Sequence, residues 1–396
     1  MLNPRLRLLS GYPFDRLRAL LDGIEPPAGR RPMVLSVGEP RHLPPPLVRE
    51  VVDAGGDLWN RYPPVEGTAE FRSAAAGWLR RRYALPERLI DADSQILPVA
   101  GTREALFLCA AVAVPPGDGR RRPAVLMPNP FYHVYDGAAL MSGADPVYLP
   151  ATRDTRFLPD LDAIAPAILD RTALMYLCSP ANPQGAVADL DYLTAAVRLA
   201  RRHDFVLAVD ECYTEIWDRH PPPGALQACA AMGGDFGNVL VFHSLSKRSS
   251  VPGLRCGFVA GDARLVDALR RLRSYGGATV PLPVLAAATA LWGDDDHVER
   301  NRALYRAKFD LAERLLGGRF GFFRPQGAFF LWLEVGDGEE AARALWAKAA
   351  LRVLPGRYLA QPDAAGANPG DRFVRVALIE DPASTEEALR RIVNTL

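Results

Sequence analysis

The sequence has few cysteines, almost no net charge and no long apolar run. Its 5 cysteines are scattered singly, without a C-x-x-C pair, which is typical of reduced thiols rather than a disulfide framework. Lys and Arg number 47 against 46 Asp and Glu, so charge gives no reason to expect nucleic acid or an anionic membrane as a partner. No window approaches the ~18 apolar residues of a membrane span, and the N-terminus lacks the apolar segment of a signal peptide. We therefore expect a cytoplasmic protein.

What the sequence does contain is an alternation of short apolar runs and amphipathic stretches in its middle part. Buried strands separated by helices favour an α/β fold with a mostly parallel sheet between helices. Seven runs are expected to form the sheet, namely 95–99, 124–127, 146–149, 173–178, 205–209, 239–243 and 255–259, with helices such as 193–203 and 265–275 between them. Ligands bind beyond the carboxyl ends of strands in such sheets, so the residues after each run are candidates for a site.

The pattern changes after residue 296. A long helix is predicted over 297–316, followed by apolar runs at 319–323, 329–335 and 373–379, a helix among them and another at 384–393. This order predicts a smaller α+β domain. We expect a large domain over 48–290 and a small domain formed by 1–47 and 291–396, with the proline-rich stretches 39–46 and 281–283 as crossings between them.

Two polar segments directly follow predicted strands. The stretch 210–213 (Asp-Glu-Cys-Tyr) closes one apolar run, and alone it fits a helix cap or a metal ligand at least as well. Lys247 ends the stretch 244–247 after another run, where a solvated loop lysine is the commoner case. Arg255 follows eight residues later. Ser, Lys and Arg converging on one crevice would make an anion site, with phosphate as the natural ligand.

Two further segments also directly follow predicted strands. Gly101, Thr102 and Arg103 lie between a strand and an apolar helix, an arrangement that aims free backbone N–H groups and the helix dipole at a ligand. Taken alone it is also a common structural turn. The stretch 179–185 carries two prolines, Asn182 and a glycine, and it reads either as a rigid turn or as a ligand contact.

In order and spacing these segments resemble the class I/II aminotransferases of fold type I, the aspartate aminotransferase superfamily. The resemblance runs from about Leu35 to Leu378. The stretch 179–185 resembles the family's Asn-Pro-x-Gly signature, and 210–213 its Asp-x-x-Tyr. Ser244-x-Ser246-Lys247 with Arg255 resembles its cofactor-lysine signature.

The resemblance implies pyridoxal 5′-phosphate as cofactor and a role for each matching residue. Lys247 would hold the cofactor and move the proton at the substrate α-carbon, with its pKa lowered by burial and neighbouring cations. Asp210 would pair with the pyridine nitrogen. Tyr213 and Asn182 would bond the ring's phenolic oxygen, and Tyr132 would stack on the ring, where a core aromatic is the alternative.

The resemblance also implies which residues contact the cofactor phosphate and which contact the substrate α-carboxylate. The cofactor and its phosphate would be held by the strand-end residues Gly101, Thr102, Arg103, Ser244, Ser246 and Arg255. Tyr62 would reach the phosphate of a neighbouring subunit, which implies a homodimer with shared active sites. Arg375 would clamp the substrate α-carboxylate, an exposed strand arginine being the alternative, and Gly38 lies on the loop that would close over the same carboxylate.

Several stretches look most like bacterial succinyldiaminopimelate aminotransferases of the lysine pathway, among them 11–14, 38–42, 129–138 and 274–284, although 276–278 (Gly-Gly-Ala) departs from that pattern. The implied reaction converts glutamate and N-succinyl-2-amino-6-oxopimelate into 2-oxoglutarate and N-succinyl-LL-diaminopimelate. Arg41 and Arg61 are hypothetical contacts for the additional carboxylates, with a solvent-exposed role as the alternative for both.

Other functions fit parts of the sequence. An aspartate or broad-specificity aminotransferase would use the same cofactor residues, and a carbon–sulfur lyase of the superfamily is more distant. Residues 244–247 also match the Ser-x-x-Lys of acyl-enzyme hydrolases, but no Ser-Asp-Asn or Lys-Thr-Gly accompanies them. A transcription regulator would need a DNA-binding domain, and the residues before Gly38 show no helix-turn-helix pattern.

Overall fold

A seven-stranded sheet forms the centre of the computed structural model, which describes residues 2–9, 11–117 and 122–396. Its strand order is β2-β8-β7-β6-β5-β3-β4, and β8 runs antiparallel to both neighbours while the other pairs are parallel. The strands are β2 (Ile96–Val99), β3 (Ala124–Asn129), β4 (Asp145–Pro150), β5 (Thr172–Cys178), β6 (Val206–Asp210), β7 (Val239–Ser244) and β8 (Gly257–Gly261). The predicted mostly parallel sheet is confirmed.

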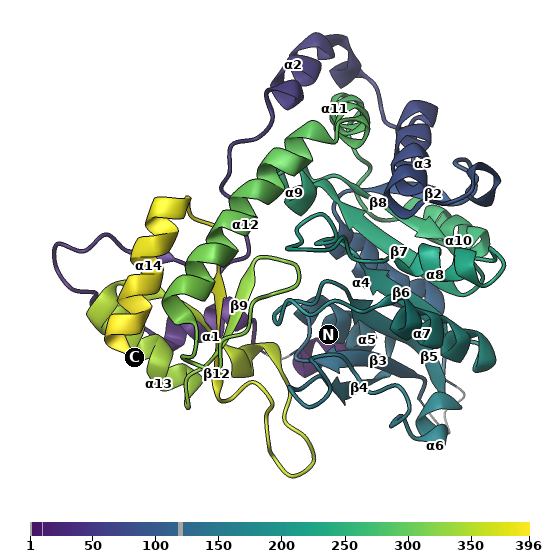
Figure 1. Ribbon diagram of the computed structural model, residues 1–396. Helices are drawn as coiled ribbons and strands as arrows, with labels where there is room; N and C mark the ends of the chain where they lie inside the picture. Colours follow the sequence, from purple (N-terminus) through teal and green to yellow (C-terminus); the bar gives the residue numbers. More distant parts are fainter. Residues whose placement is uncertain (1, 10, 118–121) are drawn as a thin grey trace.

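Helices cover both faces of this sheet (Figure 1). One face packs against α3 (Ala69–Tyr83), α7 (Leu190–Arg202), α8 (Ala225–Ala231) and α11 (Leu282–Gly293), and the other against α4 (Thr102–Ala113), α5 (His133–Ser142) and α10 (Ala263–Arg273). In β6, Leu207 and Val209 enter the first core while Val206 and Ala208 enter the second. Alternate side chains of one strand thus serve two cores, which explains the unbroken apolar run.

Smaller sheets lie beside this unit and share a separate core. The antiparallel sheet has the order β11-β12-β9, and β1 pairs with β10 in parallel. The helix α1 packs with the C-terminal helices although it lies at the other end of the chain (Figure 1). The elements are α1 (Pro13–Leu20), β1 (Met33–Val34), α12 (Asp296–Leu316), β9 (Phe330–Glu334), α13 (Gly338–Ala349), β10 (Leu351–Arg352), β11 (Leu354–Pro355), β12 (Phe373–Ala377) and α14 (Pro382–Thr395).

Three further short helices complete the fold. They are α2 (Pro46–Ala54), α6 (Pro166–Leu169) and α9 (Leu245–Arg248). The packing of residues 17–35 with the C-terminal core supports the predicted pairing of the two chain ends in a small domain, while the boundaries 48–290, 1–47 and 291–396 stay a prediction.

The apolar run 319–323 is predicted to be regular structure, and this prediction is wrong. The segment forms turns because Gly318, Phe320 and Gly321 have φ values of +77°, +53° and +55°, which a strand cannot accommodate. Similarly, the run expected at 255–259 begins as a strand only at Gly257, because Arg255 has a φ of +53°.

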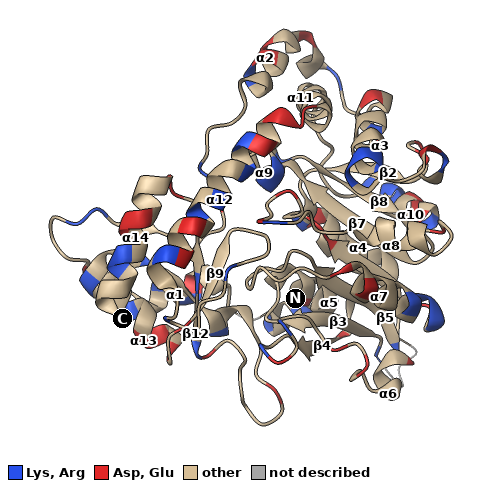
Figure 2. Ribbon diagram, viewed as in Figure 1, with Lys and Arg blue, Asp and Glu red and all other residues tan. Residues whose placement is uncertain are grey.

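Charges are mixed over the surface rather than separated. Basic and acidic side chains alternate along exposed helices such as α12 (Figure 2), in keeping with the net charge of +1. Within the described ranges, no helix combines the length and apolarity that a membrane crossing requires.

Candidate active site

A cavity of about 550 Å³ opens where the carboxyl ends of the central strands face β9 and β12. It brings together side chains from nearly every segment singled out in the sequence. Its lining includes Gly38, Thr102, Arg103, Tyr132, Asn182, Asp210, Tyr213, Ser244, Ser246, Lys247, Arg255 and Arg375. The backbone of Gly101 lies directly behind, where a Cβ atom would overlap the guanidinium of Arg255.

Lys247 lies on the one-turn helix α9, immediately after β7. Its Nζ donates a hydrogen bond to the carbonyl oxygen of Gly38 and lies 5.5 Å from the centre of the Phe329 ring. Burial lowers the pKa of Lys247 to about 8, and the positive charges of Arg375 and Arg255 act in the same direction. The direction agrees with the prediction, and it gives an amine that is partly neutral near physiological pH.

Asp210 ends β6 with only 5% of its surface exposed. The hydroxyl of Tyr135 donates to its Oδ2 at 2.8 Å, and the backbone N–H of Cys212 donates to Oδ1 at 3.2 Å. Burial raises the pKa of Asp210, while these two hydrogen bonds oppose that shift. A buried carboxylate held in this way can pair with a protonated ring nitrogen.

The N-terminus of α4 and the guanidinium of Arg255 form an anion cradle. Gly101 has a φ of +86° and precedes the helix without a side-chain cap, so the first N–H groups of α4 are free to bind a ligand. Arg255 donates to the carbonyl oxygens of Pro252 at 2.9 Å and Ala100 at 3.4 Å. Both of these acceptors are uncharged, so neither neutralises the guanidinium. A phosphate dianion fits these donors.

Arg375 lies in the middle of β12 and is 4% exposed. Its Nη1 donates to Asn182 Oδ1 at 2.8 Å and its Nη2 to the Ser36 carbonyl oxygen at 2.6 Å, while Nε has no hydrogen-bond partner among the described residues. Burial lowers its pKa to about 10, yet the side chain remains a cation at neutral pH. A buried guanidinium with neutral partners and an orphan donor is suited to a carboxylate ligand.

Aromatic side chains and an arginine form another part of the wall. The Nε of Arg103 donates to the Tyr132 hydroxyl oxygen at 2.8 Å. Burial raises the pKa of Tyr132 to about 12 and lowers that of His133 to about 4, so both stay neutral at neutral pH. Tyr213 lies edge-on to Phe329 at 5.5 Å between ring centres.

A family model for class I and II aminotransferases matches residues 30–393. The chain belongs to that family. Its cofactor is pyridoxal phosphate and its substrates are amino and keto acids. The fold agrees, because the central seven-stranded sheet is that of fold type I transferases.

Individual relatives cover nearly the whole chain. An aminotransferase structure from Neisseria meningitidis is 42% identical, with a TM-score of 0.94 and 99% of each chain covered. The LL-diaminopimelate aminotransferase of Dehalococcoides mccartyi is 30% identical over 92% of each chain. A transaminase of Streptomyces rimosus, 4-dedimethylamino-4-oxo-anhydrotetracycline transaminase OxyQ, is 34% identical over 87% of this chain and 88% of its own.

The residues present fit the cofactor that this family uses. The free N–H groups of α4 and the Arg255 guanidinium suit its phosphate, the buried carboxylate of Asp210 suits a protonated ring nitrogen, and the partly neutral amine of Lys247 suits attachment. Tyr132, Tyr213 and Asn182 line the space between these groups. Apart from Tyr62, the predicted cofactor residues therefore lie together, while the role of each one remains a proposal.

Three predicted contacts lie outside the cavity of this chain. Tyr62 is 100% exposed, as expected of a side chain that reaches a neighbouring subunit, and that role stays a prediction. Arg61 is exposed as well. Arg41 forms an ion pair with Glu380, so its guanidinium is already engaged.

Sequence reasoning gave no role to Tyr135, which holds Asp210, or to Pro13 and Phe14, which line the cavity from α1. A tyrosine three residues after Tyr132 lies one helical turn away on the same side, a spacing that could have suggested Tyr135. The contacts of α1 depend on the packing of the chain ends and leave no local signal.

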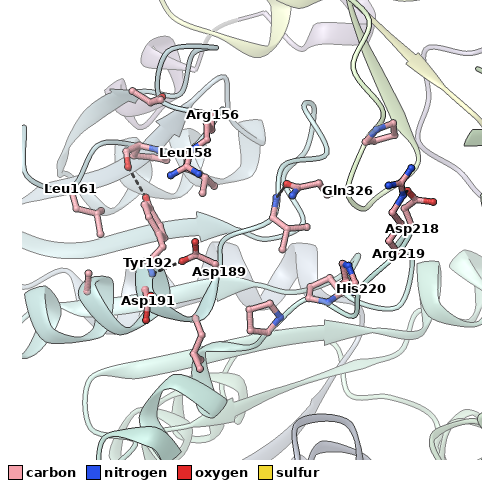
Figure 3. A pocket seen from close by; sticks show the side chains of 18 of the residues that line it. Arg156, Leu158, Leu161, Asp189, Asp191, Tyr192, Asp218, Arg219, His220 and Gln326 are labelled. Atoms are coloured by element: carbon pink, nitrogen blue, oxygen red, sulfur yellow. Dashed lines mark hydrogen bonds and ion pairs between the residues drawn. The ribbon is translucent and has the colours of Figure 1, made fainter. Parts of the chain in front are cut away.

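A larger hollow of about 1030 Å³ lies elsewhere and shares no lining residue with the site (Figure 3). Several of its polar groups are engaged in the fold: Asp189 caps α7 through the Tyr192 N–H, and the Tyr192 hydroxyl donates to the Pro159 carbonyl oxygen. Asp218 forms an ion pair with Arg324. We assign it no role in the reaction.

Proposed function

We propose that the protein is a succinyldiaminopimelate aminotransferase, which exchanges the amino group of glutamate with N-succinyl-2-amino-6-oxopimelate. The supporting observation is the charge of the cavity. Its lining carries four basic side chains, namely Lys247, Arg103, Arg255 and Arg375. The acids among the described lining residues are Asp210 and Glu39, and Asp210 is already bonded to Tyr135.

This charge favours a substrate with carboxylates at both ends. N-succinyl-LL-diaminopimelate carries three carboxylates and one ammonium group. Arg375 is matched to the α-carboxylate, which leaves the others in need of a cation. The guanidinium of Arg103 lines the cavity, and its five N–H donors outnumber its tyrosine partners, Tyr132 and Tyr12. We therefore assign a distal carboxylate to the side chain of Arg103, while its backbone N–H is among the first N–H groups of α4, which would hold the phosphate.

Free LL-diaminopimelate is the second candidate, since relatives at about 30% identity bear that name. Its distal end carries an additional ammonium group, which requires an acidic partner. Glu39 is the one lining acid that remains for this purpose in the described part of the chain, and it is exposed. The electrostatic balance thus favours the succinylated substrate over the free diamine.

The side chains divide the chemistry among them. When bound, pyridoxal phosphate supplies an electron-withdrawing ring that stabilises the negative charge developing at the substrate α-carbon. Arg375 holds the α-carboxylate and fixes the direction of the Cα–H bond. Lys247 removes the proton from Cα, for which a pKa of about 8 is suitable. Asp210 keeps the ring nitrogen protonated.

The first half-reaction tests the substrate assignment. The purified holoenzyme is mixed with N-succinyl-LL-diaminopimelate, LL-diaminopimelate or aspartate without a keto acid, and conversion of the cofactor to its pyridoxamine form is followed by absorbance. We expect the succinylated compound to react at the lowest concentration. Preferential reaction of LL-diaminopimelate would establish the second candidate, and preferential reaction of aspartate would establish an aspartate or broad-specificity enzyme.

A variant of Arg103 tests whether the preference for the succinylated substrate depends on this side chain. Arg103→Gln is expected to raise KM for the succinylated substrate about tenfold more than for alanine, which has no distal carboxylate, because one charge-assisted contact is lost. Arg198→Gln serves as the matched control in the same assay, because Arg198 is exposed and does not line the cavity. An equal effect of Arg103→Gln on both substrates would remove Arg103 from the distal site.

We also propose a homodimer with shared active sites. Large apolar side chains are exposed on the single chain at Leu43, Trp59, Tyr62, Phe107 and Tyr275, which is typical of a surface covered by a partner. Sedimentation of the holoenzyme should give twice the mass of the chain, and a monomer that retains full activity would contradict the shared site.

A further inference from the structure

A chain of buried polar groups lies behind the active site and takes no direct part in the chemistry described above. Lys308 on α12 is 0% exposed, and its Nζ lies 2.7 Å from His42 Nε2 and 3.0 Å from the carbonyl oxygen of Leu378. The Nδ1 of His42 lies 2.6 Å from Asn301 Oδ1. The Nδ2 of Asn301 donates to the carbonyl oxygens of Lys247 and Arg248, each at 3.2 Å.

The hydrogen-bond directions in this chain follow from its two ends. Because Asn301 Nδ2 donates to two carbonyl oxygens, its Oδ1 must be the atom that faces His42. His42 therefore carries its proton on Nδ1, and its Nε2 accepts from Lys308. Burial lowers the pKa of His42 to about 4 and that of Lys308 to about 7, which agrees with a neutral imidazole that accepts from the amine. The hydrogen bonds thus run outward from Lys308, through His42 and Asn301 to α9 on one side and directly to the Leu378 carbonyl on the other.

The polar chain joins three backbone segments that carry active-site groups. At one end it bonds the carbonyl of Lys247 itself. At the other end it bonds Leu378, three residues after Arg375 and directly after β12. In the middle, His42 follows Gly38 on the crossing segment, and its own carbonyl oxygen accepts from the Ser250 hydroxyl at 2.8 Å.

We infer that Lys308, His42 and Asn301 are positioning residues. They fix the position of the Lys247 amine relative to the Arg375 guanidinium across the cavity. Lys247 lies on α9, directly after a strand of the central sheet, and Arg375 lies on β12 of the small antiparallel sheet. Side-chain geometry in the cavity therefore depends on how α9 and β12 are fixed to each other. The polar chain connects the two through four hydrogen bonds, from the Lys247 carbonyl through Asn301, His42 and Lys308 to the Leu378 carbonyl. A partner lost from one bond leaves the next group unsatisfied.

The inference predicts different kinetic effects at the two ends. Asn301→Leu removes the donors to α9, so kcat should fall about tenfold with little change in KM, because Lys247 is misplaced. Lys308→Met removes the donor to Leu378, so KM for the amino donor should rise about tenfold with little change in kcat, because the carboxylate clamp is displaced. Both are measured with the amino donor that the unmodified holoenzyme converts fastest, so the result depends on transamination and not on the proposed diaminopimelate substrate.

Tyr305→Phe provides a matched control at the same place. The ring of Tyr305 packs on His42 at 4.6 Å between centres, and its buried hydroxyl has no hydrogen-bond partner in the described chain. Its removal should leave kcat and KM within about twofold of their original values, since a hydroxyl without a partner adds no bond to the polar chain. Thermal unfolding of each holoenzyme shows whether a variant has lost stability or only the relative position of Lys247 and Arg375.

Two outcomes would overturn the inference. In the first, Asn301→Leu and Lys308→Met lower the unfolding temperature but leave kcat and KM unchanged. The polar chain would then contribute to stability and not to the positions of the active-site groups. Alternatively, all three variants could change kcat and KM in parallel, which would indicate general loosening. If Lys308→Met does not fold, His42→Phe replaces it, because His42 is only partly buried and the substitution keeps an aromatic ring against Tyr305.

Discussion

Arg375 and Asn182 are joined by a hydrogen bond of 2.8 Å between Nη1 and Oδ1. The bond connects β12 with the turn after β5, so it links the small antiparallel sheet to the central sheet at the cavity. Since Asn182 is neutral, it orients the guanidinium without cancelling its charge. The site is therefore built to leave one buried positive charge for the substrate.

The first prediction concerns this charge. Arg375→Lys keeps the charge but removes the planar fork, so KM for amino donors should rise roughly ten- to a hundredfold. Steady-state kinetics with glutamate and with the succinylated substrate should show the same factor, because both carry an α-carboxylate. Arg372→Lys is the control, since Arg372 lies just before β12 and forms an exposed pair with Glu334. An unchanged KM would show that Arg375 is not the clamp.

The sequence predicted the elements whose signal is local. Most strands of the central sheet were found because they are buried on both faces and therefore apolar, as in β5, β6 and β7, whereas the edge strand β4 is only partly buried. Lys247, Asp210 and Asn182 were found because polar residues directly follow such strands. In contrast, β1, β10 and β11 have only two residues each, which is too short for a periodic pattern.

Contacts between distant segments were not predictable in the same way. The bond from Tyr135 to Asp210 spans 75 positions, and the polar chain from His42 to Lys308 spans 266. Each arises from the packing of whole elements, which a single sequence does not encode locally. The roles expected for Arg41 and Arg61 depended on a neighbouring loop and subunit, and in this chain Arg41 binds Glu380 instead.

The second prediction concerns the protonation of Lys247. The apoenzyme should capture added pyridoxal phosphate only through the neutral amine. Because the pKa is lowered to about 8, the rate of capture should rise with pH with a midpoint near pH 8, rather than near the ordinary lysine value of about 10.4. Stopped-flow absorbance gives the profile. A midpoint near the ordinary value would mean that Lys247 is not held as described.

The third prediction concerns the support of Asp210. Tyr135→Phe removes the hydroxyl that donates to Asp210 Oδ2 and keeps the ring stacked on Tyr176 at 4.5 Å. The loss of a hydrogen bond to a charged group should lower kcat about tenfold and leave KM nearly unchanged. Tyr148→Phe is the matched control, because Tyr148 donates to a different carboxylate, Asp136. Equal effects of the two variants would point to general destabilisation.

The fourth prediction concerns the anion cradle. A methyl group on Gly101 would overlap the Arg255 guanidinium, and the φ of +86° adds backbone strain. Gly101→Ala should therefore weaken retention of the cofactor by about tenfold or more, because the displaced guanidinium costs a charge-assisted contact; dialysis followed by absorbance measures it. Gly366→Ala separates the two causes, since Gly366 has a φ of +85° and no atom lies within 4 Å of the position that its Cβ would take. If Gly366→Ala loses stability but keeps the cofactor while Gly101→Ala loses it, the close approach of Gly101 to Arg255 is what forms the phosphate site. If both variants retain the cofactor equally, the cradle lies elsewhere.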